Sequence, residues 1–380
     1  MTIVFFCRLF YPHIGGVETH VLEVGKRLVR EGHKVIVITE EISGKDIPVY
    51  QSRSSSAKVT GEVEGIKIHR IPVKRDSGVS FDSAQDRQND GGKKFRIWWW
   101  LWQHKDLIKN ADIVHCHDVF FWYLPFRFLF PNKPIFTTFH GYETKFPPSK
   151  KAILIRKISE WLSNGNICIG EYVKKWYGAS SKYVTYGGVN IRNYHATVRG
   201  SYAKGIKILF IGRLEEDAGI PIYLRVMDVL KKRRVRFTFE ACGDGSFRKR
   251  VERFGKVYGF VSDLAPYIKS SDFVFASSYL SILEAMAAKK MVFSVYGNLL
   301  KKDYLKMAPF GKWIIIENSP QRVVDKILYL TQHQKEREEL VNKSYEWVEK
   351  QTWEKVTSMY VDLWRKPFRY SYNNTGSLQI

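Results

Sequence analysis

Short runs of apolar residues alternate with amphipathic stretches along most of the chain. Runs that suit buried parallel strands occupy 3–10, 34–39, 66–71, 112–118, 134–143 and 166–170. Between the first two runs, Val17, Val21, Val24 and Leu28 keep helical spacing, and Gly32 ends the helix. A strand, a helix and a second strand in this order form a βαβ unit, which implies a parallel sheet.

The alternation restarts after a polar stretch at 195–204. Further apolar runs occupy 206–211, 236–241, 257–261, 273–276, 292–295 and 313–316. We therefore expect an α/β fold of two doubly wound, Rossmann-like domains that face a central cleft. The expected domains are 1–195, with a mobile polar insertion at 76–94, and 205–350; a last helix follows at 351–366, and 367–380 is a frayed tail.

The most unusual feature of the composition is its charge. The 380 residues include 61 Lys and Arg against 38 Asp and Glu, which gives a net charge of +23. This surplus favours anionic partners such as nucleotide phosphates, an anionic membrane leaflet or nucleic acid. The alternative is a solvated basic surface without a specific partner. Since no RNA- or DNA-binding motif is present, nucleic acid is not expected.

Cysteine spacing and the lengths of the apolar runs restrict the class of protein further. Cys7, Cys116, Cys168 and Cys242 form no CxxC pair, so we expect reduced core cysteines, a cytoplasmic protein and no metal site. No apolar stretch approaches the length of a membrane-spanning helix. Residues 1–6 suit a first strand rather than a signal peptide, because no cleavage-site pattern follows them.

Two stretches combine dense aromatic residues with cations. Residues 95–102 read Phe-Arg-Ile-Trp-Trp-Trp-Leu-Trp with lysines on both sides, and residues 120–130 contain five Phe, a Trp and a Tyr beside Arg127. Amphipathic rings next to cations suit the interface of a bilayer, which predicts peripheral membrane binding. The alternative is that both stretches form ordinary core helices.

Two polar sites follow expected strands of the first domain. Gly15 and Gly16 come after the first strand, at the edge where open α/β sheets bind ligands, and glycine lets a ligand approach the backbone. His140 ends a later strand beside Gly141, which suits a histidine that touches substrate. The alternatives are a glycine turn needed only for geometry and a histidine held by a backbone hydrogen bond.

Residues 273–287 predict a ligand site in the second domain. The stretch combines a short strand, a tight loop and a helix from about Ser281, with Glu284 in the first turn of that helix. Free N–H groups at a helix start attract phosphate, and a carboxylate there can reach a sugar hydroxyl. The alternative is an ordinary strand–helix junction that serine residues cap.

Motifs in the two halves, taken together and in order, resemble those of a known family. They are Gly15-Gly16-Val17-Glu18, His115-Cys116-His117-Asp118, Phe139-His140-Gly141, Gly187-Gly188-Val189-Asn190, Gly212-Arg213-Leu214, Gly243-Asp244-Gly245, Gly259-Phe260-Val261 and Leu283-Glu284-Ala285-Met286-Ala287. Over about 3–365 the chain is similar to the retaining glycosyltransferases of the GT-B fold, specifically glycosyltransferase family 4, or glycosyl transferase group 1. The resemblance implies a nucleotide-sugar co-substrate in the C-terminal domain, an acceptor in the N-terminal domain, no cofactor or metal, and a last helix that crosses back onto the N-terminal domain.

The resemblance also implies roles for single residues. Glu284 would hold the ribose of the nucleotide, and Arg213 would stabilise the diphosphate leaving group. His140 would contact the donor sugar or its developing positive charge, while Gly15 and Gly16 would approach the diphosphate or the sugar. The remaining donor-binding candidates are Gly243, Gly245, Ser281, Ile282 and Leu283.

Two positions depart from the family pattern. Ala218 stands where members usually carry a lysine that faces the diphosphate, and Ala276 where they carry a glutamate that contacts the donor sugar. Losing a charge aimed at the leaving group costs about 3 kcal/mol of transition-state stabilisation. The lysines that are candidates to replace it after folding are Lys289, Lys290, Lys301 and Lys302.

Two functions follow from these patterns. The first is retaining transfer of a sugar from a UDP- or GDP-sugar to a lipid-linked or cell-surface glycan acceptor, peripherally at the cytosolic membrane face, as in polysaccharide biosynthesis. The alternative, motivated by Ala218 and Ala276, is a catalytically degenerate GT-B protein that serves as a nucleotide-sugar-binding or partner subunit. The fold alone also allows an epimerase, but the Gly-Arg-Leu and Leu-Glu-Ala-Met-Ala motifs favour transfer.

Overall fold

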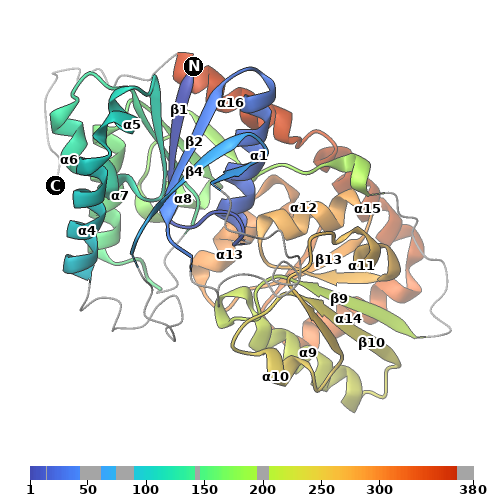
Figure 1. Cartoon of the computed structure of the whole chain (residues 1–380). Helices are drawn as coiled ribbons and strands as arrows, with labels where there is room; N and C mark the ends of the chain where they lie inside the picture. The colour runs from blue at the N-terminus through green and yellow to red at the C-terminus, as the bar shows by residue number, and fades with distance from the viewer. Residues whose placement is uncertain (14, 43–60, 74–89, 142–145, 195–204, 366–380) are drawn as a thin grey trace, which may run out of the picture.

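The structure is a computed structural model that describes residues 1–13, 15–42, 61–73, 90–141, 146–194 and 205–365 (Figure 1). The expected linker at 195–204, the tail at 367–380 and residues 76–89 of the expected insertion lie outside these ranges. Residues 90–94 were also expected in the insertion, but they begin helix α4 (Asp90–Gln103). The reason is that Ile97 and Leu101 are buried one turn apart, so the amphipathic helix extends upstream of the aromatic run.

The first half of the chain forms an eight-stranded sheet in the order β3-β4-β2-β1-β5-β6-β7-β8. Its strands are β1 (Thr2–Cys7), β2 (Lys34–Glu40), β3 (Glu62–Val63), β4 (Ile66–Ile71), β5 (Ile113–His117), β6 (Ile135–Phe139), β7 (Asn166–Ile169) and β8 (Tyr183–Thr185). All neighbouring pairs are parallel except β3 and β4. Most side chains of β1, β2, β5, β6 and β7 are buried, as expected of strands covered on both faces.

Helices connect these strands and cover both faces of the sheet. They are α1 (Gly16–Arg30), α4, α5 (Lys105–Lys109), α6 (Phe120–Leu129), α7 (Lys150–Leu162) and α8 (Tyr172–Tyr177). One core cluster joins α1 to β1 and β2, and a separate cluster joins α4 and α6 to the other side of β1 and β5. The first half is therefore doubly wound, as the sequence predicts.

The second half forms a six-stranded, all-parallel sheet in the order β11-β10-β9-β12-β13-β14. Its strands are β9 (Ile206–Ile211), β10 (Phe237–Cys242), β11 (Lys256–Gly259), β12 (Phe273–Phe275), β13 (Met291–Val295) and β14 (Ile315–Glu317). Its helices are α9 (Ile220–Lys232), α10 (Arg248–Val251), α11 (Ala265–Ser270), α12 (Tyr279–Ala287), α13 (Leu299–Lys306), α14 (Pro320–Gln332) and α15 (Gln334–Val348), with a 3-10 turn η3 (Glu216–Ala218) before α9.

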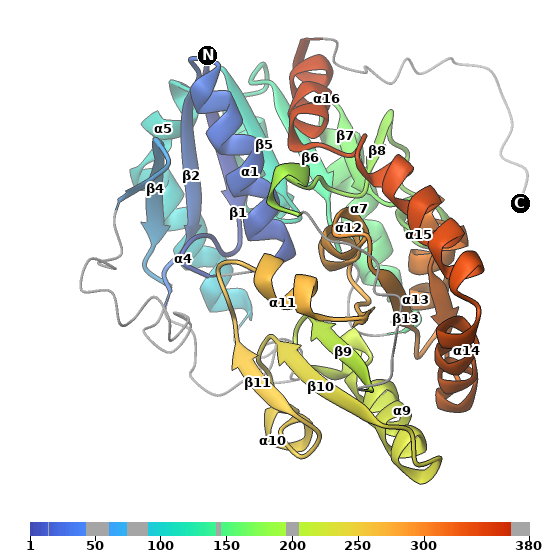
Figure 2. The ribbon, with the colours of Figure 1, turned by 90° about the vertical axis from the view of Figure 1, so that its right-hand side faces the viewer.

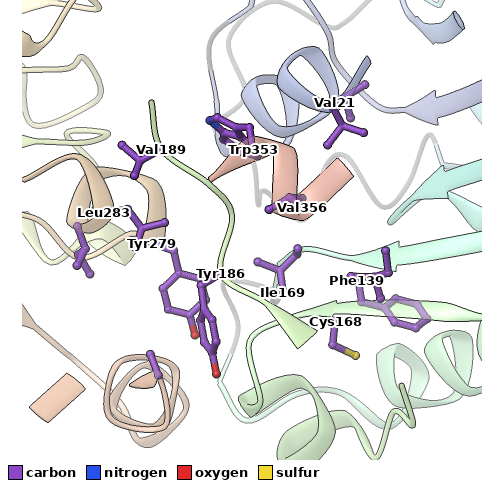
Figure 3. Packing of buried hydrophobic residues seen from close by; sticks show 14 of the residues in the cluster. Val21, Phe139, Cys168, Ile169, Tyr186, Val189, Tyr279, Leu283, Trp353 and Val356 are labelled. Atoms are coloured by element: carbon purple, nitrogen blue, oxygen red, sulfur yellow. The ribbon is translucent and has the colours of Figure 1, made fainter. Parts of the chain in front are cut away.

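The last helix, α16 (Trp353–Arg365), returns to the first half and packs against α1, as Figure 2 shows. Val189 N–H donates to the Gln351 carbonyl at 2.9 Å where the chain crosses back. Figure 3 shows side chains of α1, β6, β7, α12 and α16 in one buried cluster that spans the two halves. The two Rossmann-like halves and the returning helix expected from the sequence are therefore confirmed.

Cys7, Cys116, Cys168 and Cys242 are buried free thiols, as expected. Burial raises the pKa of each thiol, most strongly at Cys7 and Cys116. Within the part of the chain that the structure describes, no helix has the length and apolar character to cross a bilayer. The same residues contain no group of three or more His, Cys, Asp or Glu side chains arranged to hold a metal ion.

Candidate active site

The carboxyl ends of the two sheets meet at the start of α12. Gly170, which follows β7, has no space for a side chain, because a Cβ there would lie 2.5 Å from the Tyr279 hydroxyl. Gly187, which follows β8, lies in the same way against Leu280. Since α12 itself follows the carboxyl end of β12, this junction brings together the edges at which both sheets are expected to bind ligands.

Helix α12 begins two residues before the expected position. Ser278 is extended, with φ −122° and ψ 146°, and is the residue before the first helical turn. The helix begins at Tyr279 because Tyr304 holds that residue, accepting its backbone N–H at 2.9 Å and stacking on its ring at 3.9 Å. Glu284 is therefore in the second turn of α12, and its expected place in the first turn is wrong.

Glu284 is half-buried, and burial raises the pKa of its carboxyl group to about 7. A hydrogen bond from the Tyr194 hydroxyl opposes this rise, while the nearby charges of Asp263 and Glu23 add to it. Glu23 belongs to α1, so the first half contributes to the electrostatic environment of this carboxylate. Protonation of Glu284 therefore lies within the physiological pH range.

The other candidates on α12 differ in what they can offer a ligand. Ser281 is half-buried, and its hydroxyl lies 3.1 Å from that of Ser278 at the helix start. The side chains of Ile282 and Leu283 are fully buried in the cluster shared by both halves. Any contact of these two residues with a ligand would have to use the backbone.

Backbone hydrogen bonds join the glycine loops at the ends of β9, β10 and β11. Gly212 N–H donates to the Cys242 carbonyl at 3.1 Å, Leu214 N–H to the Asp244 carbonyl at 2.8 Å, and Gly243 N–H to the Gly259 carbonyl at 2.7 Å. Gly243 has φ 148°, and a Cβ there would overlap the Gly212 carbonyl. Gly245 has φ 157°, with a Cβ position 2.5 Å from the Leu214 carbonyl oxygen. Both positions therefore require glycine, because of their positive φ and the neighbouring backbone, which leaves no room for a Cβ.

Two cations flank this edge of the second sheet. Arg213 follows β9, is about half exposed and is ion-paired with Asp217 of η3. Lys301, in the first turn of α13, is buried, and its Nζ lies 4.2 Å from the centre of the Tyr304 ring. Burial lowers the pKa of Lys301 to about 8, with Asp217 opposing the shift and Arg213 adding to it. The charges of Lys301 and Arg213 therefore influence each other across this edge of the sheet.

The other lysines proposed as substitutes have different surroundings. Lys290 donates to the carbonyls of Lys269 and Ser271 at 3.0 and 2.7 Å, and Lys289 lies over the Tyr345 ring. Ala276 is fully buried, and its carbonyl accepts a hydrogen bond from Ser294 Oγ at 2.6 Å. The position of the family glutamate is therefore part of the core, and no carboxylate is available there.

The first half contributes the Gly15–Gly16 loop and His140. Gly15 precedes the first residue of α1, with extended backbone at φ −163°. A Cβ built on Gly16 or on Gly141 would meet nothing within 4 Å. The fold therefore leaves open space beside both glycines, at the carboxyl edge where β1 and β6 end.

His140 is buried and neutral. Burial, together with the positive charge of Arg156, lowers the pKa of His140 to about 3. His140 Nε2 and His117 Nδ1 share a hydrogen bond of 2.8 Å. The backbone N–H of His140 donates to the Asp118 carboxylate. With Nε2 engaged, Nδ1 is the ring nitrogen through which His140 can contact a ligand. Arg156 of α7 also donates to the Gly141 carbonyl at 2.6 Å.

Sequence reasoning missed that His140 belongs to a buried group of histidines tied to α16. The His20 ring lies edge-on to His140 at 4.8 Å, and its Nε2 is 2.9 Å from the Tyr360 hydroxyl. Tyr360 also bonds to Thr138 on β6 at 2.9 Å. Trp364 Nε1–H donates to His115 Nδ1 at 3.0 Å, which fixes His115 as the Nε2–H tautomer. The sequence signal for this group was the alternation of His115 and His117 along β5, which places both on one face of the sheet.

Comparison with known proteins identifies the class of protein. The family model described as Glycosyltransferase Family 4 matches residues 14–191, and the one described as Glycosyl transferases group 1 matches residues 195–347. An uncharacterised glycosyltransferase of Methanocaldococcus jannaschii is 24% identical over 93% of this chain and 97% of its own length. A component of human phosphatidylinositol N-acetylglucosaminyltransferase is 34% identical over 65 residues, 17% of this chain and 11% of that protein.

A solved structure gives the same result for the fold. The Anabaena protein HepE, in complex with UDP and glucose, superposes with a TM-score of 0.67 at 13% identity, covering 96% of this chain and 99% of that one. Two facing Rossmann-like halves with a returning helix define the GT-B architecture. Within that class, the chain belongs to the glycosyltransferases of family 4, also described as group 1.

Proposed function

We propose that the protein is a retaining glycosyltransferase that moves a sugar from a UDP- or GDP-sugar to a lipid-linked or cell-surface glycan acceptor at the cytosolic face of a membrane. The observation that carries the donor part is Arg213 at the carboxyl end of β9, with buried Lys301 near enough for the charges of Arg213 and Asp217 to shift its pKa. Two cations at the carboxyl edge of a parallel sheet suit a diphosphate.

The chemistry needs these charges. As the bond between the sugar C1 and the diphosphate oxygen breaks, negative charge grows on the leaving diphosphate, and fixed cations lower the barrier. Lys301 supplies the second cation that Ala218 cannot provide. One of the two reasons for considering a catalytically degenerate protein is thereby weakened. Neutral His140 offers its Nδ1 to a sugar hydroxyl, and Glu284, when ionised, accepts hydrogen bonds from the ribose.

The nature of the substrates rests on relatives and on charge. HepE binds UDP and glucose, which supports a UDP-sugar as donor. The name of the human relative specifies a phosphatidylinositol acceptor, which supports a lipid-linked acceptor here. The net charge of +23 favours a location at an anionic cytosolic leaflet.

The test is a nucleotide-release assay on purified protein with a panel of UDP-, GDP- and ADP-sugars, with and without a membrane extract. Release with one donor, lost in Arg213→Ala and Glu284→Ala, supports the proposal and names the donor. The anomeric configuration of the product, read by NMR, then decides whether transfer is retaining.

The same assay separates the alternative of a non-catalytic subunit. Saturable nucleotide binding that depends on Glu284, without release from any donor or extract, would favour that alternative. In that case the acceptor and membrane parts of the proposal would also fall, since no transfer takes place.

A further inference from the structure

Exposed apolar side chains gather on three helices of the first half. Among the described residues, nine of the fourteen large hydrophobic side chains that are exposed belong to α4, α6 and α7. On α4 they are Phe95, Trp99 and Trp102; on α7 they include Leu154, Ile158 and Trp161, with Ile155 beside them. Both sets have spacings of four and then three residues, so each forms one stripe along its helix.

The three helices form one continuous layer. Helix α6 packs against both α4 and α7, and the three lie together on the left flank of Figure 1. The inward residues of α4 and α6, such as Leu101 and Trp122, are buried in their own core cluster. The outward residues are not needed for that core, since Trp99, Phe128 and Trp161 are 64%, 72% and 71% exposed. We call the outward sides of α4, α6 and α7 the docking face.

The charge of the docking face identifies its partner. The three helices carry eight Lys and Arg and two acidic residues, and one of these two, Glu160, is buried. Arg96, Lys151 and Lys157 are exposed beside the apolar stripes, and Lys105 lies 4.9 Å from the Trp102 ring. A second copy of this chain would bring like charges together, whereas an anionic bilayer accepts both the cations and the apolar side chains.

The docking face is one helix away from the site described above. Arg156 lies on α7, and it donates to the Gly141 carbonyl and to Asp118. Asp118 in turn accepts the backbone N–H of His140. A bilayer against the outward side of α7 would therefore place lipid next to the part of the first half at which the acceptor is expected.

We propose that the exposed sides of α4, α6 and α7 form a docking surface for an anionic lipid bilayer, with Trp99, Trp102 and Trp161 in the interface and the flanking cations over acidic headgroups. Helix α7 is an essential part of this surface. The inference deepens the proposed function, but its test does not need sugar transfer.

The test is co-sedimentation of the full chain with vesicles of phosphatidylcholine alone or with 30 mol% phosphatidylglycerol, roughly the charge of an anionic leaflet. We expect binding to the anionic vesicles and about tenfold weaker binding when Trp102, Leu154 and Trp161 are all replaced by serine. Tyr329→Ser, at an exposed aromatic residue of α14, is the control and should bind like the wild type. Unchanged thermal melting of both variants would show that the fold is intact.

Two outcomes would overturn the inference. One is binding of the triple variant equal to that of the wild type, since the three side chains are then not in the interface. The other is a dimer by light scattering that the triple variant converts to a monomer, with no vesicle binding by either form, since a second copy then covers the face. Nucleotide release from a sugar donor, measured in the same preparations without vesicles, tests the proposed function separately.

Discussion

Replacing Lys301 by methionine tests whether a residue far from Ala218 in the sequence supplies the missing cation. Methionine keeps most of the volume of the buried stem, so the main change is the loss of one charge beside Arg213. A preorganised charge aimed at a leaving group is worth about 3–4 kcal/mol when the site excludes water. Lys301 is only 7% exposed, so solvent screening is weak, and we expect kcat to fall by about 10²- to 10³-fold.

The pKa of Lys301 provides a second, independent signature. Because burial lowers this pKa to about 8, the free enzyme loses the cation as the pH rises through about 8. We therefore expect kcat/KM to fall above that pH in the wild type. Lys301→Arg keeps its charge throughout, so its profile should stay flat on the alkaline side.

The assay is steady-state nucleotide release from the active donor between pH 6 and 10, with Lys302→Met as the matched control. The control removes a charge from the next residue on the same helix, which is half-buried and was another of the four candidates from the sequence. Equal rates for Lys301→Met and Lys302→Met would refute the reasoning. So would an alkaline fall in the wild type that persists in Lys301→Arg.

Three further predictions concern the donor site, the glycine loops and the returning helix. The affinity for the nucleoside diphosphate should rise as the pH increases through about 7, because Glu284 must ionise to accept the ribose hydroxyls; calorimetric titration should show no such rise in Glu284→Gln. Gly16→Ala should melt like the wild type, since the space beside Gly16 is open, yet lose turnover; full turnover would contradict the expected role of Gly16. Gly243→Ala should fail to fold normally, because its Cβ would overlap the Gly212 carbonyl. Tyr360→Phe removes buried hydrogen bonds to His20 and Thr138 and should lower the free energy of unfolding in urea by about 1–3 kcal/mol. Tyr329→Phe, at an exposed hydroxyl, should have a smaller effect, and equal effects would contradict this account.

The fold was predictable because its strands are buried on both faces and therefore form unbroken apolar runs. The run at Ile206–Ile211 and the helical spacing of Val17, Val21 and Val24 are local signals that tertiary packing did not override. The start of α12 was misplaced because Tyr304, 25 positions away, fixes Tyr279 at the helix start. Local helix propensities contain no information about that contact.

The candidate site was predictable only in part. Glycine loops and strand ends mark the ligand-binding edge of each sheet, and His140 lies at one of these edges. Which lysine approaches Arg213 depends on how α13 packs against α12, so the sequence offered four candidates without a choice. The exposed stripe of α7 was missed because Leu154, Ile158 and Trp161 also fit a buried helix face, and only the structure shows that this side faces outward.

The most direct test of the central claim is calorimetric titration of UDP and of GDP into the wild type, Glu284→Ala and Lys301→Met. The account predicts saturable binding of at least one nucleoside diphosphate to the wild type, weakened by about tenfold or more in each variant, because both residues hold the same ligand. If neither nucleotide binds, or if both variants bind as tightly as the wild type, the donor site is not at the carboxyl edge of the second sheet.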